Sequence, residues 1–136
     1  YKWVGEYSSA IPMLVKKILD NENPIYAWGS GNQRRSYMHA SDCARLMNKI
    51  MDLDEDNITV NIGTEETISI AELVTLICKL SNKKPSICFD KSKPEGRFIK
   101  SSDSSYLKKL IDGKLTKVSI EEGIKKMLDW HQKSFK

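Results

Sequence analysis

The stretch Ser69-Ile70-Ala71-Glu72 constrains how this chain folds more than any other feature. A serine followed three residues later by a glutamate is the capping box that begins a helix, and Ile68 and Leu73 flank it at hydrophobic-staple spacing. Apolar residues then recur at the helical period. A helix is therefore expected to run to about Leu80, with an inward face made of Ile70, Leu73, Val74 and Ile77.

Short β-prone runs lie on both sides of that helix. ITVNIG (58–63) is rich in β-branched residues and ends at a glycine, and PSICFD (85–90) follows the helix. PIYAW (24–28) predicts a third strand. The alternating RSYMHA (35–40) predicts an extended segment after a turn at 29–32.

Further helices are expected between these runs. They run from Ser8 or Ser9 to about Leu19, from Ser41 onward, from Asp103 or Ser104 through Leu110, and from a second capping box at 119–122 onward. The predicted apolar faces of three of them are Ile11, Leu14, Val15 and Ile18; Cys43, Leu46, Met47 and Ile50; and Ile120, Ile124, Met127, Leu128, His131 and Phe135. Because strands alternate with helices, the predicted fold class is α/β with some parallel pairing.

The composition excludes several classes of protein. The chain has 136 residues, enough for one domain, and its 40% hydrophobic and 29% charged residues are typical of a globular protein. The net charge of +4 mildly favours an anionic ligand, but Lys and Glu alternate instead of clustering, so no nucleic-acid partner is expected. No apolar run reaches the roughly 18 residues of a membrane span, and no signal peptide is recognisable.

The three cysteines, Cys43, Cys78 and Cys88, form no CxxC pair. Cys43 and Cys78 fall on predicted apolar helix faces, which favours buried free thiols and a reducing, cytoplasmic compartment. The chain begins at Tyr1 in a stretch that is typical of a loop, so a piece of a longer protein is expected.

The chain offers few groups for catalysis or metal binding. His39 and His131 are the only histidines, and neither has a partner at metal-ligand spacing, so no metal site and no catalytic residue is predicted. Residues 29–31, Gly-Ser-Gly, begin a GxGxxG pattern, but Arg34 stands where the last glycine belongs and no clear helix follows. The dinucleotide fingerprint therefore fails.

Cations near two turns are the remaining candidates for binding. Arg34 and Arg35 follow the glycine turn, and the later loop carries Lys93, Arg97 and Lys100. Arginine matches phosphate oxygens with two parallel hydrogen bonds, so the two groups could converge on a diphosphate, although solvated surface is the alternative. Adjacent residues of an extended segment point to opposite faces, so only one of the two arginines should face a ligand. Tyr26 and Trp28 share a strand face, where either ring could stack on a base or pack in a core.

The order of the motifs resembles the C-terminal half of the extended short-chain dehydrogenase/reductase family, the NAD-dependent epimerases and dehydratases, whose members act on nucleotide sugars. The matching stretches are Ile11-Pro12, residues 28–31 (WGSG), 35–42 (RSYMHASD), 61–64 (NIGT), 69–73 (SIAEL), 93–96 (KPEG) and 119–123 (SIEEG). Within the family, WGSG together with KPEG is most similar to the GDP-L-fucose synthase branch.

The resemblance implies roles for individual residues. Arg35 matches the arginine that grips the substrate diphosphate, Trp28 a substrate-pocket tryptophan, and Lys17 a basic substrate-binding position. Glu95 matches the acidic residue of the KPEG-type loop, and Lys100 a lysine just beyond it. Tyr26, Arg34, Lys93 and Arg97 are additional candidates. Lys17 could instead be helix surface, Trp28 core, and Glu95 the cap of its own turn.

The chain also departs from the family pattern. Ser36 stands where Asp is usual, and Ile99 where an arginine is expected, which leaves the sugar and the reaction type open. None of the five tyrosines is followed four residues later by lysine, so the Tyr-x-x-x-Lys pair needed for hydride chemistry is missing.

The resemblance therefore implies that residues 1–136 form the substrate-binding region together with the last elements of the cofactor-domain sheet. NAD or NADP would be bound by an N-terminal Rossmann half, which would be one partner; a nucleotide-diphosphate sugar would be the other, with a homodimer as a further expectation. Alone, the chain is expected to be inactive and to associate through an unpaired strand edge. A stand-alone anion- or nucleotide-binding module is the alternative.

Overall fold

Helix α3 (Ile70–Ser81) begins where its capping box predicts, in a computed structural model that describes residues 9–53 and 57–134. The Ser69 hydroxyl accepts a hydrogen bond from the Glu72 N–H at 3.1 Å, and the Glu72 carboxylate accepts one from the Ser69 N–H at 2.8 Å. The helix ends at Asn82, which takes the left-handed conformation that asparagine tolerates. All four residues of its predicted inward face are buried.

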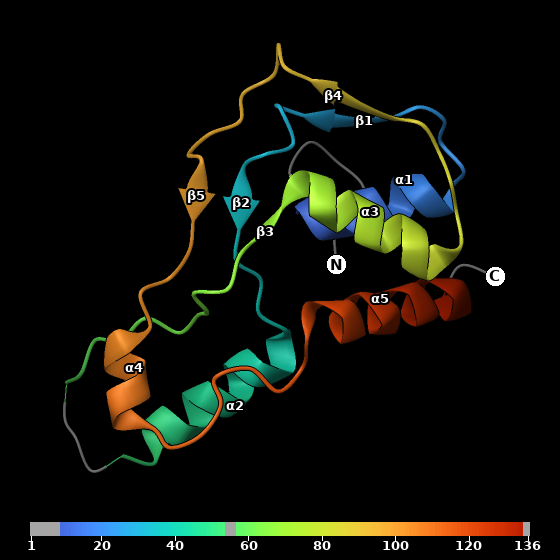
Figure 1. Ribbon diagram of the computed structural model, residues 1–136. Coiled ribbons are helices and arrows are strands. Elements are labelled where there is room, and N and C mark those ends of the chain that lie inside the picture. The colour runs from blue at the N-terminus through green and yellow to red at the C-terminus, as the bar shows by residue number, and fades with distance from the viewer. Residues whose placement is uncertain (1–8, 54–56, 135–136) are drawn as a thin grey trace.

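Two helices and a strand cover that buried face. Helices α1 (Ala10–Leu19) and α5 (Ile120–Ser134) lie beside α3, and strand β1 (Ile25–Trp28) completes the cluster (Figure 1). Their buried residues include Leu14, Val15, Ile18, Ile25, Ala27, Ile124 and Leu128. The predicted faces of α1 and α5 are thus confirmed except at two positions: His131 is half-buried and is not part of this cluster, and Phe135 lies outside the described residues. Within the described ranges, no helix has the length and hydropathy needed to cross a membrane.

The strands are short and form two small sheets. Their bounds are β1 as above, β2 (Arg34–Arg35), β3 (Ile68–Ser69), β4 (Ile87–Asp90) and β5 (Ile99–Lys100). Strand β1 pairs in parallel with β4, while β2 pairs antiparallel with β3 and parallel with β5. The predicted α/β class with parallel pairing is confirmed, although only the first residue of the extended segment 35–40 lies in a ladder.

A second, smaller cluster lies away from α3. Helices α2 (Ala40–Met51) and α4 (Ser105–Leu110) meet through Leu46, Leu107 and Ile111, and the two helices lie together at the lower left of Figure 1. Helix α2 begins one residue earlier than predicted, because the His39 ring, and not a serine, caps it by accepting from the Ser41 N–H at 3.2 Å.

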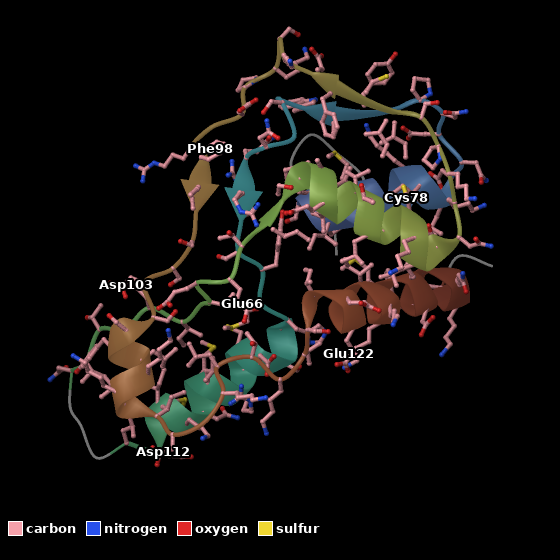
Figure 2. All side chains as sticks on the ribbon, viewed as in Figure 1. Glu66, Cys78, Phe98, Asp103, Asp112 and Glu122 are labelled. Atoms are coloured by element: carbon pink, nitrogen blue, oxygen red, sulfur yellow. The ribbon has the colours of Figure 1, made fainter. Side chains whose placement is uncertain are left out.

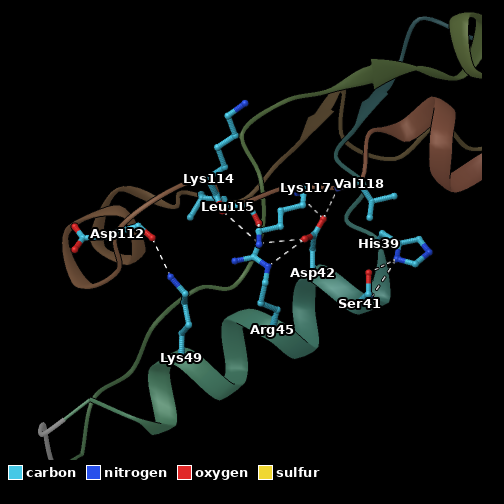
Figure 3. A network of polar contacts seen from close by, with 10 residues as sticks. All are labelled: His39, Ser41, Asp42, Arg45, Lys49, Asp112, Lys114, Leu115, Lys117 and Val118. Carbon is cyan, nitrogen blue, oxygen red and sulfur yellow. Dashed lines mark hydrogen bonds and ion pairs between the residues drawn. The ribbon is translucent and has the colours of Figure 1, made fainter.

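The linker 112–118 runs along α2 and decides which of its residues are buried (Figure 3). Asp42 is only 2% exposed and accepts hydrogen bonds from the backbone of this linker. Met47, predicted to be buried, is 52% exposed, and Cys43 is half-buried instead of buried. The linker offers backbone N–H groups that need an acceptor, so it covers the Asp42 side of the helix. Cys78 is buried on α3 as predicted (Figure 2).

The predicted strand at 58–63 is wrong. The segment has no ladder partner among the described residues, although Val60 and Ile62 are partly buried against the α2–α4 cluster. Side-chain alternation can be read from a sequence, whereas a strand also needs a neighbour whose backbone groups are free to pair. The described part of the chain places no such neighbour beside residues 58–63.

Candidate functional site

A hollow of about 880 Å³ opens between α1, the end of β1 and the segments around β2 and β5. We call it the central hollow. Its volume lies within the range of about 300–1,000 Å³ that is usual for small-molecule sites. Three predicted substrate residues line it: Trp28, Arg35 and Lys100. They come from three separate segments, and the hollow is also lined by Gln33, Tyr37, Asn61, Ser102 and Asp103.

Of the two adjacent arginines, Arg35 lines the hollow and Arg34 does not. Arg34 is turned to the other side, where its guanidinium donates to the Thr67 carbonyl at 2.7 Å and lies 3.2 Å from the Glu72 carboxylate. This split follows from the opposite faces of an extended segment. Arg34 therefore supports the start of α3, and Arg35 is the arginine available to a ligand.

The Arg35 guanidinium is held by backbone carbonyls. Its Nη1 donates to the carbonyls of Arg34 at 2.7 Å and Arg97 at 2.8 Å, and its Nη2 donates to that of Glu95 at 2.8 Å. Guanidinium carries five N–H donors. Nε–H and one N–H of Nη2 therefore have no partner among the described residues, and the group remains able to bind an anion.

Trp28 and Tyr26 share one face of β1, as predicted, and this face is exposed. They are 59% and 55% exposed, so the alternative that Trp28 belongs to the core is wrong. The Lys93 ammonium lies 6.0 Å from the centroid of the Trp28 ring, at the outer limit of a cation–π contact. The indole of Trp28 thus stands at the mouth of the hollow with Lys93 beside it.

Glu95 connects two segments that are distant in sequence. Its carboxylate accepts a hydrogen bond from the Ser30 N–H, and this bond lowers the pKa of the Glu95 carboxyl. Glu95 does not line the central hollow, and its carboxylate bonds to the earlier glycine turn and not to its own. Its predicted contact with the substrate remains a prediction.

Lys17 and Arg97 also lie apart from the lining of the hollow. The Lys17 ammonium donates to the Tyr26 carbonyl at 3.1 Å and lies 3.9 Å from Glu22. Arg97 contributes a carbonyl to Arg35, as described above. The structure thus brings together Trp28, Arg35 and Lys100 but leaves Lys17 outside the lining of the hollow, bonded to the backbone of β1.

Gln33 and Tyr37 are among the lining residues that were not predicted from the sequence. Gln33 is 5% exposed; its Nε2 donates to the Trp28 carbonyl at 2.8 Å, and its Oε1 has no partner among the described residues. Burial raises the pKa of the Tyr37 phenol, and the charge of Arg35 acts against this. Both residues could have been found, because Gln33, Arg35 and Tyr37 alternate on one side of an extended segment.

Among the described residues, the glycine turn at 29–31 differs from the phosphate-binding turn of a dinucleotide fold. The glycine turn leads into β2 and not into a helix, and the N-terminus of α3 beside it already donates its Ala71 N–H to the Gly31 carbonyl at 2.9 Å. A Cβ at Gly31 would collide with the Phe89 ring, so this glycine makes room for a side chain of the chain itself. The same residues contain no group of three or more His, Cys, Asp or Glu side chains that could hold a metal ion.

Comparisons with known proteins agree with the fold. The profile of the NAD dependent epimerase/dehydratase family matches residues 2–63. GDP-L-fucose synthase 1 of Arabidopsis thaliana is 29% identical over 133 residues, covering 95% of this chain and 41% of the relative. GDP-L-colitose synthase of Yersinia pseudotuberculosis is 32% identical over 124 residues, covering 88% of this chain and 40% of the relative.

Solved structures show the same partial coverage. The UDP-glucuronic acid 4-epimerase of Bacillus cereus, in complex with UDP-glucuronic acid and NAD, is 25% identical with a TM-score of 0.82, over 94% of this chain and 41% of the other. The chain thus spans about two fifths of the length of the relatives it matches, and it aligns with their C-terminal part. By its motifs, its parallel strand pairs and these likenesses, the chain is homologous to the C-terminal part of GDP-L-fucose synthases, and its residues 2–63 match the NAD dependent epimerase/dehydratase family.

Proposed function

We propose that this chain is the nucleotide-sugar-binding region of an NAD(P)-dependent epimerase, dehydratase or reductase similar to GDP-L-fucose synthase. The observation that carries the proposal is the meeting of Trp28, Arg35 and Lys100 at the central hollow. An aromatic face and two cations from separate segments are the groups that a nucleoside diphosphate requires. The relatives named above, which act on GDP- and UDP-linked sugars by their names, support the same ligand class.

Each of the three residues has a proposed role. Arg35 offers its unused donors to the diphosphate, and Lys100, its partner in the parallel β2–β5 register, adds a second positive charge. Trp28 offers an exposed indole for stacking. The roles first proposed for Lys17 and Glu95 would require contacts outside the lining of the hollow.

The chemical step is proposed to need residues beyond this chain. NAD or NADP would supply hydride transfer and would be bound by a Rossmann half, and the sequence lacks the Tyr-x-x-x-Lys acid. Residues 1–136 would then act as the substrate-binding region, with a Rossmann half as their partner and a homodimer as a further proposal. The identity of the sugar stays open, since an arginine clamp binds phosphate and does not contact the base.

A two-dimensional amide NMR titration with GDP and UDP tests this function. The expected result is a set of shifts near Trp28, Arg35 and Lys100. Arg35→Ala should weaken nucleotide binding about tenfold or more, because a charge-assisted hydrogen bond contributes about 1.5–3 kcal/mol. Arg34→Ala removes the same charge from the opposite face and should have a much smaller effect. Shifts that are absent from the hollow, or equal losses in both variants, would refute the assignment.

A further inference from the structure

The loop between β4 and β5, residues 91–98, is attached to the glycine turn by the Glu95 side chain. The carboxylate accepts a hydrogen bond from the Ser30 N–H. Gly29 has a φ of +82°, and a Cβ there would collide with Glu95 Cγ. A glycine is needed at this position both for the backbone conformation and for the close approach of Glu95. Two separate observations therefore indicate that the loop and the turn fit each other.

The same loop supplies the acceptors that hold Arg35. The carbonyls of Glu95 and Arg97 accept from its Nη2 and Nη1, both at 2.8 Å. Gly96 lies between them with a φ of +69°, and a Cβ there would be 3.6 Å from Nη2. The loop therefore lies against the guanidinium, and the orientation of Arg35 depends on where the loop is held.

We propose that Glu95 is a positioning residue that attaches the 91–98 loop to the glycine turn and thereby orients the Arg35 guanidinium toward a diphosphate in the central hollow. This inference rests on the proposed function. The donors left unused on Arg35 are Nε–H and one N–H of Nη2, and these two nitrogens border one edge of the planar group. An edge of this kind binds two phosphate oxygens side by side. Glu95 thus acts through Arg35 and makes no contact with the ligand.

The sign of the effect separates this role from a direct electrostatic one. Glu95 is an anion, so its removal would by itself strengthen the binding of another anion nearby. A positioning role predicts weaker binding, because a released loop lets Arg35 adopt other conformations. A contact with the sugar would instead weaken only sugar-bearing ligands and leave inorganic pyrophosphate unaffected.

The test measures binding of GDP and of inorganic pyrophosphate to the 136-residue chain by isothermal titration calorimetry. Glu95→Ala is expected to weaken both ligands about tenfold, which corresponds to one well-oriented charge-assisted hydrogen bond. Glu95→Gln keeps an oxygen that can accept from Ser30 and should restore most of the affinity. Combined with Arg35→Ala, Glu95→Ala should add little, because both changes act on one group. Glu121→Ala removes the same charge from an exposed pair with Lys125 on α5 and should change nothing.

Two results would overturn the inference. The first is unchanged or tighter binding of both ligands by Glu95→Ala. The second is weaker binding of GDP alone. Either result would contradict the positioning role and leave the proposed function standing. Absence of any binding by the unaltered chain would instead refute the proposed function. In that case hydrogen exchange of the Ser30 amide decides whether Glu95 attaches the loop. Faster exchange in Glu95→Ala supports the attachment, and equal exchange contradicts it.

Discussion

Asp42 is the one charged side chain that is buried in the described part of the chain. It accepts hydrogen bonds from the N–H groups of Lys117 and Val118, both at 2.9 Å, and pairs with Arg45 at 3.0 Å (Figure 3). Arg45 also donates to the Leu115 carbonyl at 2.7 Å. These contacts join α2 to the linker that leads into α5, so one residue helps to hold the two hydrophobic clusters together.

Asp42→Asn should therefore be strongly destabilising. The linker N–H groups bond to one carboxylate oxygen and Arg45 to the other, so an amide with a single acceptor leaves one of the two sets unpaired and removes the charge opposite Arg45. Breaking such a buried pair costs about 3 kcal/mol. Urea unfolding followed by circular dichroism measures the free energy of unfolding. Asp112→Asn is the matched control, because Asp112 is exposed and only its backbone carbonyl bonds to Lys49. Equal effects of both changes would contradict this role.

The contribution of Asp42 should also depend on pH. Burial would raise the pKa of its carboxyl, but the hydrogen bonds from Val118 and Lys117 and the charge of Arg45 outweigh this and hold the pKa below its ordinary value of 3.8. A lowered folded-state pKa stabilises the fold above the unfolded value, and this stabilisation is lost as the pH falls through the folded value. The difference in free energy of unfolding between the unaltered chain and Asp42→Asn should be full at pH 7 and shrink below pH 3.8. A constant difference over this range would show that ionisation is irrelevant.

Among the helices, α3 is the element whose start depends most on local side chains. Its capping box satisfies two backbone N–H groups, and the Arg34 guanidinium lies against the same Glu72. Arg34 and Ser69 also join β2 to β3, because they are partners in the antiparallel register. The start of α3 thus anchors the strand from which Arg35 reaches the central hollow.

Ser69→Ala is expected to lower the free energy of unfolding by about 1 kcal/mol, the usual cost of losing an N-cap side chain. Thr75→Ala, in the middle of the same helix, removes an exposed hydroxyl that donates only to the Ala71 carbonyl and should be close to neutral. Thermal unfolding of both variants gives the comparison. If Thr75→Ala costs as much as Ser69→Ala, the capping box is not what starts the helix.

At the scale of the whole molecule, the two clusters differ in how well they are covered. The α1–α3–α5 cluster is closed by three helices and a strand, whereas the α2–α4 cluster has three buried residues and adjoins exposed methionines. Met47 is 52% and Met51 is 80% exposed, one helical turn apart on α2. Segment 58–63 beside this cluster has no ladder partner in the described ranges. This end of the molecule is therefore the expected site of association.

Sedimentation velocity over a range of concentrations should accordingly show self-association of the chain. Replacing both methionines, Met47→Lys with Met51→Lys, should reduce association, because it places two charges on the exposed side of α2 where the methionines lie. Tyr106→Lys changes an exposed ring on α4 in the same way and should have a smaller effect. A monomer at high concentration for the unaltered chain would contradict this expectation.

The sequence by itself determined the local structure of this protein. Three local features depend on residues close together in the chain: the helix starts at Ser69 and Ser119, the inward faces of α1 and α3, and the placement of Tyr26 and Trp28 on one face of β1. The ordered motifs were enough to indicate the family. The opposite faces of an extended segment already predicted that Arg34 and Arg35 point apart. They did not show which of the two arginines would line the hollow.

Only the tertiary structure decided which segments meet. The partners of Arg35 at Glu95 and Arg97 are 60 and 62 positions away, and the linker contacts that bury Asp42 are 75 and 76 positions away. The unpaired state of 58–63 likewise depends on which strands lie beside it. Periodicity and capping describe interactions within a few residues, whereas hydrogen bonds between distant segments depend on how the helices and strands pack. The central hollow belongs to this second group, since its walls come from segments that no local pattern brings together.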